Sequence, residues 1–229
     1  MISTRTALVT GGTGGLGAAT ISAFLAAGWR VVAPVRPGTA GRLPEGAIAV
    51  DADLTVRADV QAAADVAAGD PEAPLRAVVN LVGGYAGSGL VADTPVEDFE
   101  AMLTVNLRPT YLITAATLPH LVTAGGGSVV CVSSRAAVSP FPGAAGYVTA
   151  KAAVLAFAGA VAVEYRKQRV RCNTVLPSVI DTPANRAAMP DADPSGWVSP
   201  AEIADVVLFL ASDASGPTTG AQIPVYGQA

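Results

Sequence analysis

The chain has 229 residues, of which 51% are hydrophobic and 14% charged, with a mean hydropathy of +0.46. This composition argues against disorder and provides for a large core. The net charge of −4 and the lack of a Lys/Arg run argue against a nucleic-acid or acidic-membrane partner. Two cysteines, Cys131 and Cys172, lie in apolar runs, which favours buried free thiols over a disulfide framework or a zinc site, so no metal is expected.

Short β-branched segments alternate along the chain with longer alanine-rich segments. The expected strands are 6–10, 30–36, 47–51, 76–82, 127–134, 169–176 and 221–226. The expected helices are 15–27, 55–68, 95–121, 147–167 and 200–212. Several strands are apolar on both faces, as in a parallel sheet covered on both sides. The pattern predicts an α/β fold: a doubly wound Rossmann-type parallel sheet of about seven strands, flanked by helices on both faces.

Residues 1–229 are expected to form a single dinucleotide-binding catalytic domain, because no linker-like change in composition divides them. The longest irregular stretch, 189–200, is interpreted as a loop beside the site. Residues 109–134 contain no Asp, Glu, Lys or Arg, but Pro119, His120 and a glycine triplet interrupt them, which predicts helix, loop and strand rather than a membrane span. With no apolar stretch of signal-peptide length at the start, we expect a soluble cytoplasmic protein.

A glycine-rich segment, "TGGTGGLG" (10–17), joins the first expected strand to the first expected helix. Glycines at such a turn let the backbone approach a pyrophosphate, whose charge the helix N-terminus favours. Three motifs fit the same letters: Gly12, Gly14 and Gly17; Gly11, Gly14 and Gly17; or Gly11, Gly15 and Gly17. The glycines alone do not choose between these three motifs.

The residues after the second strand bear on which dinucleotide is bound. NAD-binding proteins often carry an acidic residue there, whereas this chain has Val35 and then Arg36. A basic residue suits a 2′-phosphate, so NADP(H) is favoured and NAD(H) remains possible; the alternative is that Arg36 is an ordinary exposed arginine. Gly14 occupies a place where a second basic residue could have reinforced the phosphate site.

The apolar helix segment "GYVTAKAAVLAF" carries Tyr147 and Lys151, four residues apart and so on one helix face. A nearby ammonium together with a nicotinamide charge can lower the pKa of a tyrosine by about three units, or roughly 4 kcal/mol. The pair therefore suits a tunable acid/base. Ser134 ends the preceding strand, and strand alternation directs its neighbour Ser133, the alternative catalytic serine, to the opposite face. Asn106 lies just before Pro109, which should kink its helix and free a carbonyl.

These motifs together resemble the short-chain dehydrogenase/reductase family in its compact single-domain branch. The resemblance runs over nearly the whole chain and includes the glycine segment, "DADLT", "NLVGG" at 80–84, the residues above and "PSVIDTP" at 177–183. It favours the motif made by Gly11, Gly15 and Gly17. It implies a catalytic set of Asn106, Ser134, Tyr147 and Lys151. It further implies cofactor contacts from Gly11, Thr13, Gly15, Leu16, Gly17, Arg36, Asp53, Leu54, Asn80, Gly83, Tyr147, Lys151, Pro177, Ile180 and Thr182.

The resemblance also assigns roles. Tyr147 would be the general acid/base, Lys151 would lower its pKa and hold the ribose, and Ser134 would bind the substrate carbonyl. Asn106 would hold a water that links Lys151 to solvent. Three departures from the family pattern are Leu81-Val82 in place of Asn-Ala, Ser178 in place of glycine, and the altered ending "PVYGQA".

The expected function is that of an oxidoreductase, a ketoreductase or alcohol dehydrogenase, acting on a small-molecule carbonyl or alcohol. Alternatives are a dinucleotide-binding regulatory protein without turnover, and a nucleotide-sugar epimerase or dehydratase. His120, the only histidine, lacks the G-x-S-x-G context of a hydrolase and is interpreted as structural. The family implies a homo-oligomer, tetramer or dimer, through the helix that carries Tyr147. Tyr85, Phe141, Met189 and Trp197 fall in segments expected to border the substrate cleft.

Overall fold

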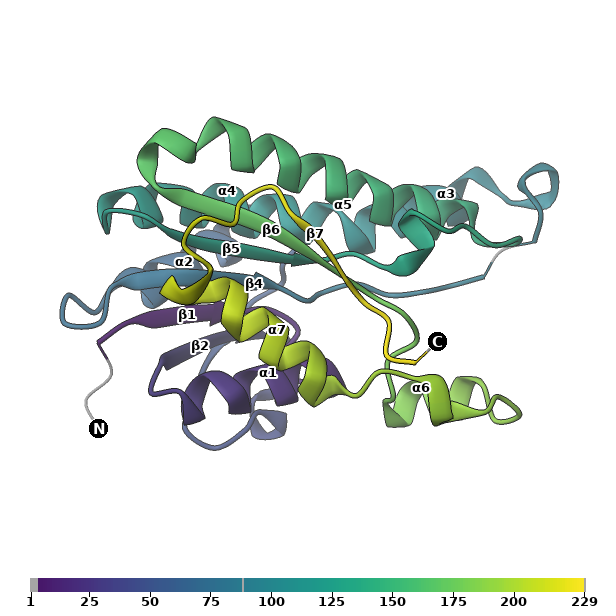
Figure 1. Cartoon of the computed structure of the whole chain (residues 1–229), viewed down its shortest axis with the longest axis horizontal. Helices are drawn as coiled ribbons and strands as arrows, with labels where there is room; N and C mark the ends of the chain where they lie inside the picture. Colours follow the sequence, from purple (N-terminus) through teal and green to yellow (C-terminus); the bar gives the residue numbers. More distant parts are fainter. Residues whose placement is uncertain (1–3, 88, 229) are drawn as a thin grey trace.

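The structure is a computed structural model that describes residues 4–87 and 89–228. Its centre is a sheet of seven strands in the order β3-β2-β1-β4-β5-β6-β7 (Figure 1). All neighbouring strands are parallel. The strands are β1 Thr6–Val9, β2 Arg30–Val35, β3 Ile48–Asp51, β4 Leu75–Asn80, β5 Gly127–Val132, β6 Val170–Pro177 and β7 Gln222–Val225. The Rossmann-type fold expected from the sequence is confirmed.

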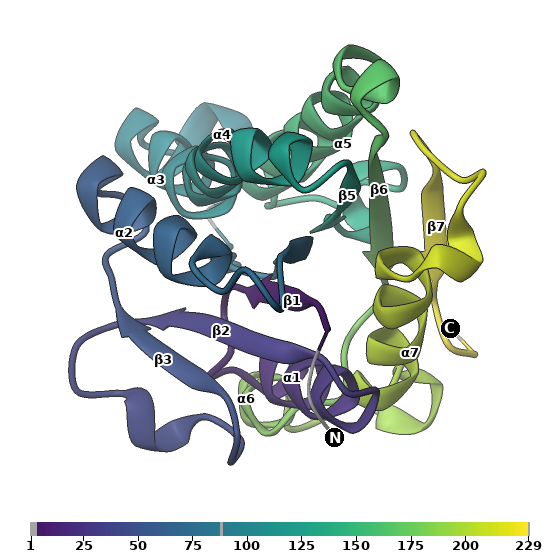
Figure 2. The same ribbon diagram turned by 90° about the vertical axis from the view of Figure 1, so that its left-hand side faces the viewer.

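Helices cover both faces of this sheet, as Figure 2 shows from one end. They are α1 Gly15–Ala26, α2 Arg57–Ala68, α3 Val96–Asn106, α4 Arg108–Thr123, α5 Ala145–Glu164, α6 Pro183–Ala188 and α7 Pro200–Ala211. Helices α2, α4 and α5 bury one cluster of apolar side chains against the sheet, and α1 and α7 bury a second cluster on the other face. Strands β1, β2, β4, β5 and β6 therefore contribute alternate side chains to two cores, which explains why several strands are apolar on both faces.

Two features differ from the elements expected from the sequence. The expected helix 95–121 is two helices, α3 and α4, that meet at Leu107. Pro109 lies in the first turn of α4, where its missing N–H costs nothing and its ring prevents a continuous helix. The short helix α6 was not expected; Thr182 caps it by accepting a hydrogen bond from the Asn185 N–H (3.2 Å). By contrast, Pro119 lies inside α4 without ending it.

One helix among the described residues, α5, is long and apolar enough to cross a membrane by length and composition alone, with 20 residues and a hydropathy of 1.6. In this fold α5 packs against β6 and α3, and it buries Lys151 among core side chains. A core helix passes the same test of length and composition. The place of α5 in the fold thus explains the buried part of its apolar surface, which is 39% of the apolar window.

The side chain of Thr10, directly after β1, links the carboxyl ends of β1 and β4. Its hydroxyl donates to the Val79 carbonyl (3.3 Å) and accepts from the N–H groups of Leu81 (3.0 Å) and Val82 (3.4 Å). From β1 the strand order runs one way to β2 and β3 and the other way to β4 and beyond, so the topological switch point lies between β1 and β4. Ligands of open α/β sheets bind at such a point, outside the carboxyl ends of the strands. Thr10 therefore fixes the edge at which the glycine segment and the residues after β4 meet.

Candidate active site

The glycine segment forms a tight turn between β1 and α1. Gly11 has a φ of +71°, a backbone conformation that other residues rarely adopt, and its carbonyl accepts a hydrogen bond from the Gly14 N–H (3.1 Å). A Cβ on Gly17 would overlap the Gly11 carbonyl, and a Cβ on Gly15 would lie 2.9 Å from the Thr182 methyl group. Both positions thus need glycine for close approach of the backbone.

Gly14 differs from these positions, because the nearest atom to a Cβ there is the Gly11 oxygen at 3.5 Å, an ordinary contact. Space is restricted at every position of the motif made by Gly11, Gly15 and Gly17, whereas the other two motifs require Gly14. Gly12, which belongs to one of those two, is also restricted, with a Cβ there 2.6 Å from Ile21. The contact between Gly15 and Thr182 also places the start of α6 against the glycine turn. The segment predicted to hold the pyrophosphate and the segment predicted to position the carboxamide are adjacent here.

The predicted catalytic side chains converge at the end of β5 and the first turns of α5. Ser134 follows β5, and its hydroxyl accepts a hydrogen bond from the Ala136 N–H (3.1 Å). Tyr147 and Lys151 share one face of α5, with the Lys151 Nζ 5.9 Å from the centre of the Tyr147 ring. The Nζ donates to the Val132 carbonyl (3.1 Å), so the ammonium is tied to β5 beside Ser134.

Burial shifts the proton affinities of both residues. Burial raises the pKa of Tyr147, and a hydrogen bond with Ser134 opposes part of this rise. Burial lowers the pKa of Lys151 from 10.5 to about 8, since its ammonium loses water around it. The expectation that Lys151 lowers the Tyr147 pKa is not met by the protein alone. Burial and the neighbouring Tyr85 raise this pKa, only the hydrogen bond with Ser134 lowers it, and the phenol remains protonated at neutral pH.

The neighbouring Ser133 and the only histidine have structural roles. Ser133 is 3% exposed and its hydroxyl donates to the Lys151 carbonyl (2.7 Å), which fixes α5 to the end of β5. His120 lies in α4 with its Nε2 3.2 Å from an Asp65 carboxylate oxygen. Within residues 4–87 and 89–228, no three His, Cys, Asp or Glu side chains are grouped to hold a metal ion.

Asn106, the last residue of α3, is fully buried and holds the segment after β4. Its Oδ1 accepts from the Gly84 N–H (3.1 Å), and its Nδ2 donates to the carbonyls of Gly84 (2.9 Å) and Met102 (3.0 Å). A Cβ on Gly83 would lie 2.6 Å from the Asn106 Oδ1 and 3.0 Å from the Lys151 Nζ. Glycine at 83 therefore lets the segment after β4 pass between two predicted catalytic residues.

Asn80, at the end of β4, lies in a buried polar cluster. Its Nδ2 donates to Thr114 Oγ1 (3.0 Å) and lies 3.8 Å from the Cys131 sulfur, while its Oδ1 has no partner among the described residues. Both cysteines are free and buried, as expected. The hydrogen bond to Cys131, with burial, raises the pKa of Cys172 well above the ordinary value, so Cys172 is a neutral thiol.

The predicted adenine end is exposed and carries charge. Asp53 accepts hydrogen bonds from the N–H (2.8 Å) and hydroxyl (2.7 Å) of Thr55, which lower its pKa. Arg36 is exposed near Asp53, and Leu54 packs against the core. Arg42 was missed from the sequence: its Nη2 donates to the Thr13 carbonyl (3.3 Å), so a second guanidinium lies over the glycine turn. The turn-forming letters "PGTAG" before it are the signal that could have shown the chain folding back.

The segment after β6 is tied to α6, to α7 and to the C-terminal strand. Pro177 ends β6, and Ile180 pairs with Val198 just before α7. Ser178, which stands where glycine was expected, donates its hydroxyl to the Tyr226 carbonyl (2.8 Å). This hydrogen bond directs the Ser178 hydroxyl toward the C-terminal segment. The serine that replaces the family's glycine therefore ties the end of β6 to the segment after β7.

Two aromatic side chains border Tyr147 on its exposed side. The Tyr85 ring stands edge-on to the Tyr147 ring, with centres 5.2 Å apart, and the Phe141 ring lies 6.1 Å from Tyr85. Tyr85 is 59% exposed and Phe141 46% exposed, so both present apolar surface next to the predicted acid/base. This supports the expectation that the loops carrying them border the substrate site. Met189 is also exposed and Trp197 is half-buried.

The short chain dehydrogenase family matches residues 5–193 of this chain. The chain belongs to this family. It is 34% identical over 245 residues to 2-(R)-hydroxypropyl-CoM dehydrogenase of Xanthobacter autotrophicus, covering 97% of both chains. It is 32% identical over 216 residues to an uncharacterised NAD-dependent oxidoreductase of Mycobacterium tuberculosis, covering 82% of this chain and 78% of the relative.

Among solved structures, a short-chain type dehydrogenase/reductase from Mycobacterium ulcerans superposes with a TM-score of 0.91 at 27% identity, covering 99% of this chain and 90% of that one. Membership makes this short-chain dehydrogenase an oxidoreductase of alcohol and carbonyl groups that uses a nicotinamide dinucleotide. The family expectation from the sequence is confirmed.

Substitution of alanine at Gly17 and at Gly14 tests which of the three glycine motifs the turn requires. Gly17→Ala places a Cβ on the Gly11 carbonyl and should lower the free energy of unfolding by about 1–3 kcal/mol, even though alanine favours helix. Gly14→Ala meets no close atom and should change it by less than about 0.5 kcal/mol. Urea unfolding of both variants measures this; equal losses would contradict the motif made by Gly11, Gly15 and Gly17.

The lowered pKa of Lys151 makes stability depend on pH. Because the unfolded chain holds this proton up to its usual pKa of 10.5 and the folded chain only to about 8, the cost of burying the ammonium falls as pH rises through this range. The free energy of unfolding of the wild type, relative to Lys151→Met, should rise by about 2 kcal/mol between about pH 7 and pH 10.

Urea unfolding at several pH values measures this difference. The chain's other lysine, Lys167, is exposed in the turn after α5, and Lys167→Met serves as the matched control. That control should show no such pH-dependent difference from the wild type. Parallel stability curves for wild type and Lys151→Met would show that the Lys151 pKa is not lowered.

Proposed function

We propose that this short-chain dehydrogenase transfers hydride between NADP(H) and a carbonyl or secondary alcohol, with Tyr147 as general acid/base. The observation that carries the proposal is the convergence of Ser134, Tyr147 and Lys151 in one half-buried site beside the glycine turn. A similar relative is named as a dehydrogenase of a hydroxypropyl compound, which is consistent with oxidation of a secondary alcohol.

The residues fit a dinucleotide. The turn at Gly11, Gly15 and Gly17 is packed so closely that a Cβ at each position would meet neighbouring protein atoms, and it opens the N-terminus of α1, where a pyrophosphate is favoured. Thr13 and Leu16 complete this turn, Asp53 and Leu54 would contact the adenine, and Asn80 and Gly83 would lie near the ribose. Pro177, Ile180 and Thr182 would position the carboxamide. When bound, the nicotinamide supplies or accepts the hydride.

The chain's own residues would then handle the proton. The Ser134 hydroxyl would donate to the substrate carbonyl oxygen, and Tyr147, kept protonated by its raised pKa, would give its proton to that oxygen. The Lys151 ammonium would stabilise the resulting phenolate and hold the ribose. The side-chain amide of Asn106 is occupied by Gly84 and Met102. Its main-chain carbonyl accepts a hydrogen bond from the Thr110 hydroxyl (3.2 Å), and the second lone pair of that carbonyl would be the acceptor for a water.

The preference for NADP(H) rests on two arginines. Arg36 follows β2, and Arg42 crosses back over the Thr13 carbonyl, so both guanidinium groups border the side of the glycine turn where the adenine ribose would lie. Arginine matches the geometry and charge of a phosphate. The relative named as NAD-dependent keeps NAD(H) as the alternative.

Assembly and location belong to the same proposal. The outer surface of α4 and α5 carries a Tyr111–Phe157 ring pair 5.7 Å apart and an exposed Val163, which is compatible with helix packing between subunits. We expect a homo-oligomer, tetramer or dimer, in the cytoplasm. Light scattering of the purified protein measures its mass.

The Tyr147 role is tested by removing one oxygen atom. Tyr147→Phe should lower kcat about 10²- to 10⁴-fold while NADPH binding is retained, because only proton transfer is lost. Turnover is measured from the loss of nicotinamide absorbance when NADPH or NADH is mixed with candidate ketones, aldehydes and 3-oxoacyl thioesters. Tyr85→Phe, which removes a phenol oxygen beside the same ring, is the matched control and should keep most activity. Binding of NADPH without any turnover in the wild type would favour the regulatory alternative.

The two arginines are tested by binding alone. Arg36→Gln and Arg42→Gln should each weaken NADPH binding about tenfold, the equivalent of about 1.4 kcal/mol, and leave NADH binding nearly unchanged. Isothermal titration calorimetry with each dinucleotide measures this. Arg166→Gln, which removes an exposed arginine beyond the end of α5, controls for net charge. Equal losses for NADPH and NADH would show that neither arginine recognises the 2′-phosphate.

A further inference from the structure

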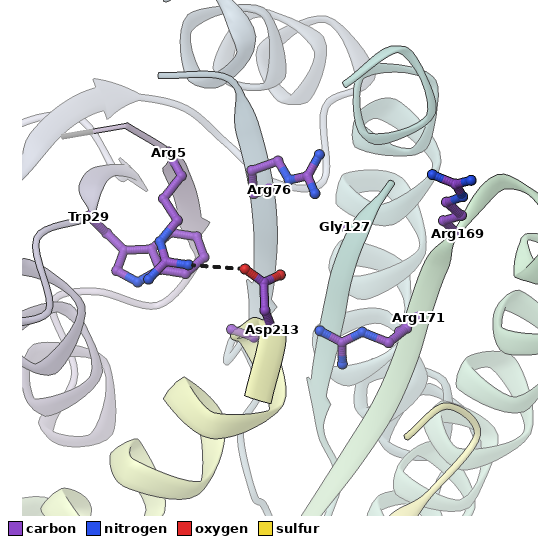
Figure 3. Close-up of a pocket in the computed structure, with 8 residues that line it drawn as sticks. Arg5, Trp29, Arg76, Gly127, Arg169, Arg171 and Asp213 are labelled. Atoms are coloured by element: carbon purple, nitrogen blue, oxygen red, sulfur yellow. Dashed lines mark ion pairs between the residues drawn. The ribbon is translucent and has the colours of Figure 1, made fainter. Parts of the chain in front are cut away.

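Four arginines gather at the edge of the sheet opposite the active site. They line a cavity of about 90 Å³ together with Trp29, Gly127, Ala211 and Asp213. Arg5 precedes β1, Arg76 lies in β4, Arg169 precedes β6 and Arg171 lies in β6, so all four are near the amino ends of the strands. In Figure 3 the guanidinium groups of Arg76 and Arg171 lie between the Arg5–Asp213 pair and Arg169.

The charge of this cavity is not balanced by its lining. Among the described residues the lining holds four arginines and one carboxylate, Asp213, whose side chain is 94% exposed and 3.7 Å from Arg5. An exposed pair at that distance contributes little. The chain as a whole is acidic, with a net charge of −4, yet four of its 14 Lys and Arg residues are concentrated here.

Three of the arginines are held in place by other groups. Arg76 donates to the Ala124 carbonyl at the end of α4 (2.6 Å), and Arg171 donates to the carbonyls of Leu210 and Ser212 at the end of α7 (2.9 Å each). The Arg5 guanidinium stacks on the Trp29 ring, 4.1 Å from its centre. These contacts fix the guanidinium groups before any ligand binds, which reduces the entropy lost on binding.

Helix ends explain only part of the cluster. Carbonyls at helix C-termini attract cations, which accounts for Arg76 and Arg171. They do not account for Arg169, which also lines the cavity and whose side chain makes no hydrogen bond or ion pair with the described residues; its backbone has a φ of +60°. Arg76 also uses one of its five N–H groups in the hydrogen bonds seen, so donors remain for a ligand.

We propose that this cavity binds a small dianionic oxyanion, a phosphate or sulfate group. Arg5, Arg76, Arg169 and Arg171 would surround the oxyanion with planar N–H donors, the geometry that suits phosphate. The bound anion would join β1, β4 and β6 at their amino ends. This site is distinct from the dinucleotide site, which lies at the carboxyl ends of the same strands.

The probe is inorganic phosphate, titrated into the full chain by isothermal titration calorimetry at constant ionic strength, with chloride as the reference anion. The wild type should show saturable binding. Arg169→Asn should weaken this binding at least about tenfold, the equivalent of about 1.4 kcal/mol, through loss of one charged contact. Asparagine tolerates positive φ, so this variant should fold. Asp213→Asn should have the opposite effect and tighten binding, because it removes the only carboxylate of the lining.

Two matched variants separate this site from other anion effects. Arg166→Asn removes the same charge three residues from Arg169, outside the cavity, and should leave phosphate binding unchanged. Arg42→Gln, at the glycine turn, should also leave it unchanged. No saturable binding, equal weakening in Arg166→Asn and Arg169→Asn, or loss of binding only in Arg42→Gln would each overturn the proposal.

Discussion

The burial of the Lys151 ammonium is the constraint on which the rest of the site depends. A buried cation is costly unless neighbouring groups compensate it, and here its pKa falls to about 8. The Val132 carbonyl accepts a hydrogen bond from the Lys151 ammonium, and the Ser133 hydroxyl donates to the Lys151 carbonyl. Gly83 leaves room beside the ammonium. The position of Lys151 thus requires a defined end of β5, a defined first turn of α5 and a glycine after β4.

The same burial determines what Tyr147 can do. A phenol in this setting has a raised pKa, so it holds its proton at neutral pH and can give it up only when a nearby positive charge stabilises the phenolate. The Lys151 ammonium lies one helical turn away, 5.9 Å from the centre of the Tyr147 ring, but within the protein alone burial is the largest effect on the Tyr147 pKa. A cationic nicotinamide next to both residues would shift the balance. In the proposed reaction, proton transfer from Tyr147 would therefore depend on the bound dinucleotide and not on the protein side chains alone.

Much of this arrangement could be predicted from the sequence, because it depends on local patterns. Alternating apolar segments predicted the seven strands, and the spacing of Tyr147 and Lys151 predicted a shared helix face. The break at Leu107 was expected as a kink because Pro109 acts on its own helix. Arg42, the α6 helix and the Ser178–Tyr226 hydrogen bond were not predicted. Each depends on a contact between segments distant in sequence, which periodicity and spacing do not report.

The polarity of a parallel sheet explains why both edges attract charge. Crossover helices begin at the carboxyl edge, so their N-termini favour an anionic dinucleotide there. The same helices end at the amino edge, where their carbonyls attract cations, and Arg76 and Arg171 meet the ends of α4 and α7 in this way. Arg5 and Arg169 add charge beyond what those helix ends offset. The arginines at the amino ends of the strands thus have two roles: two of them bind helix C-termini, and all four form the proposed anion site. Neither role alters the fold that positions Tyr147.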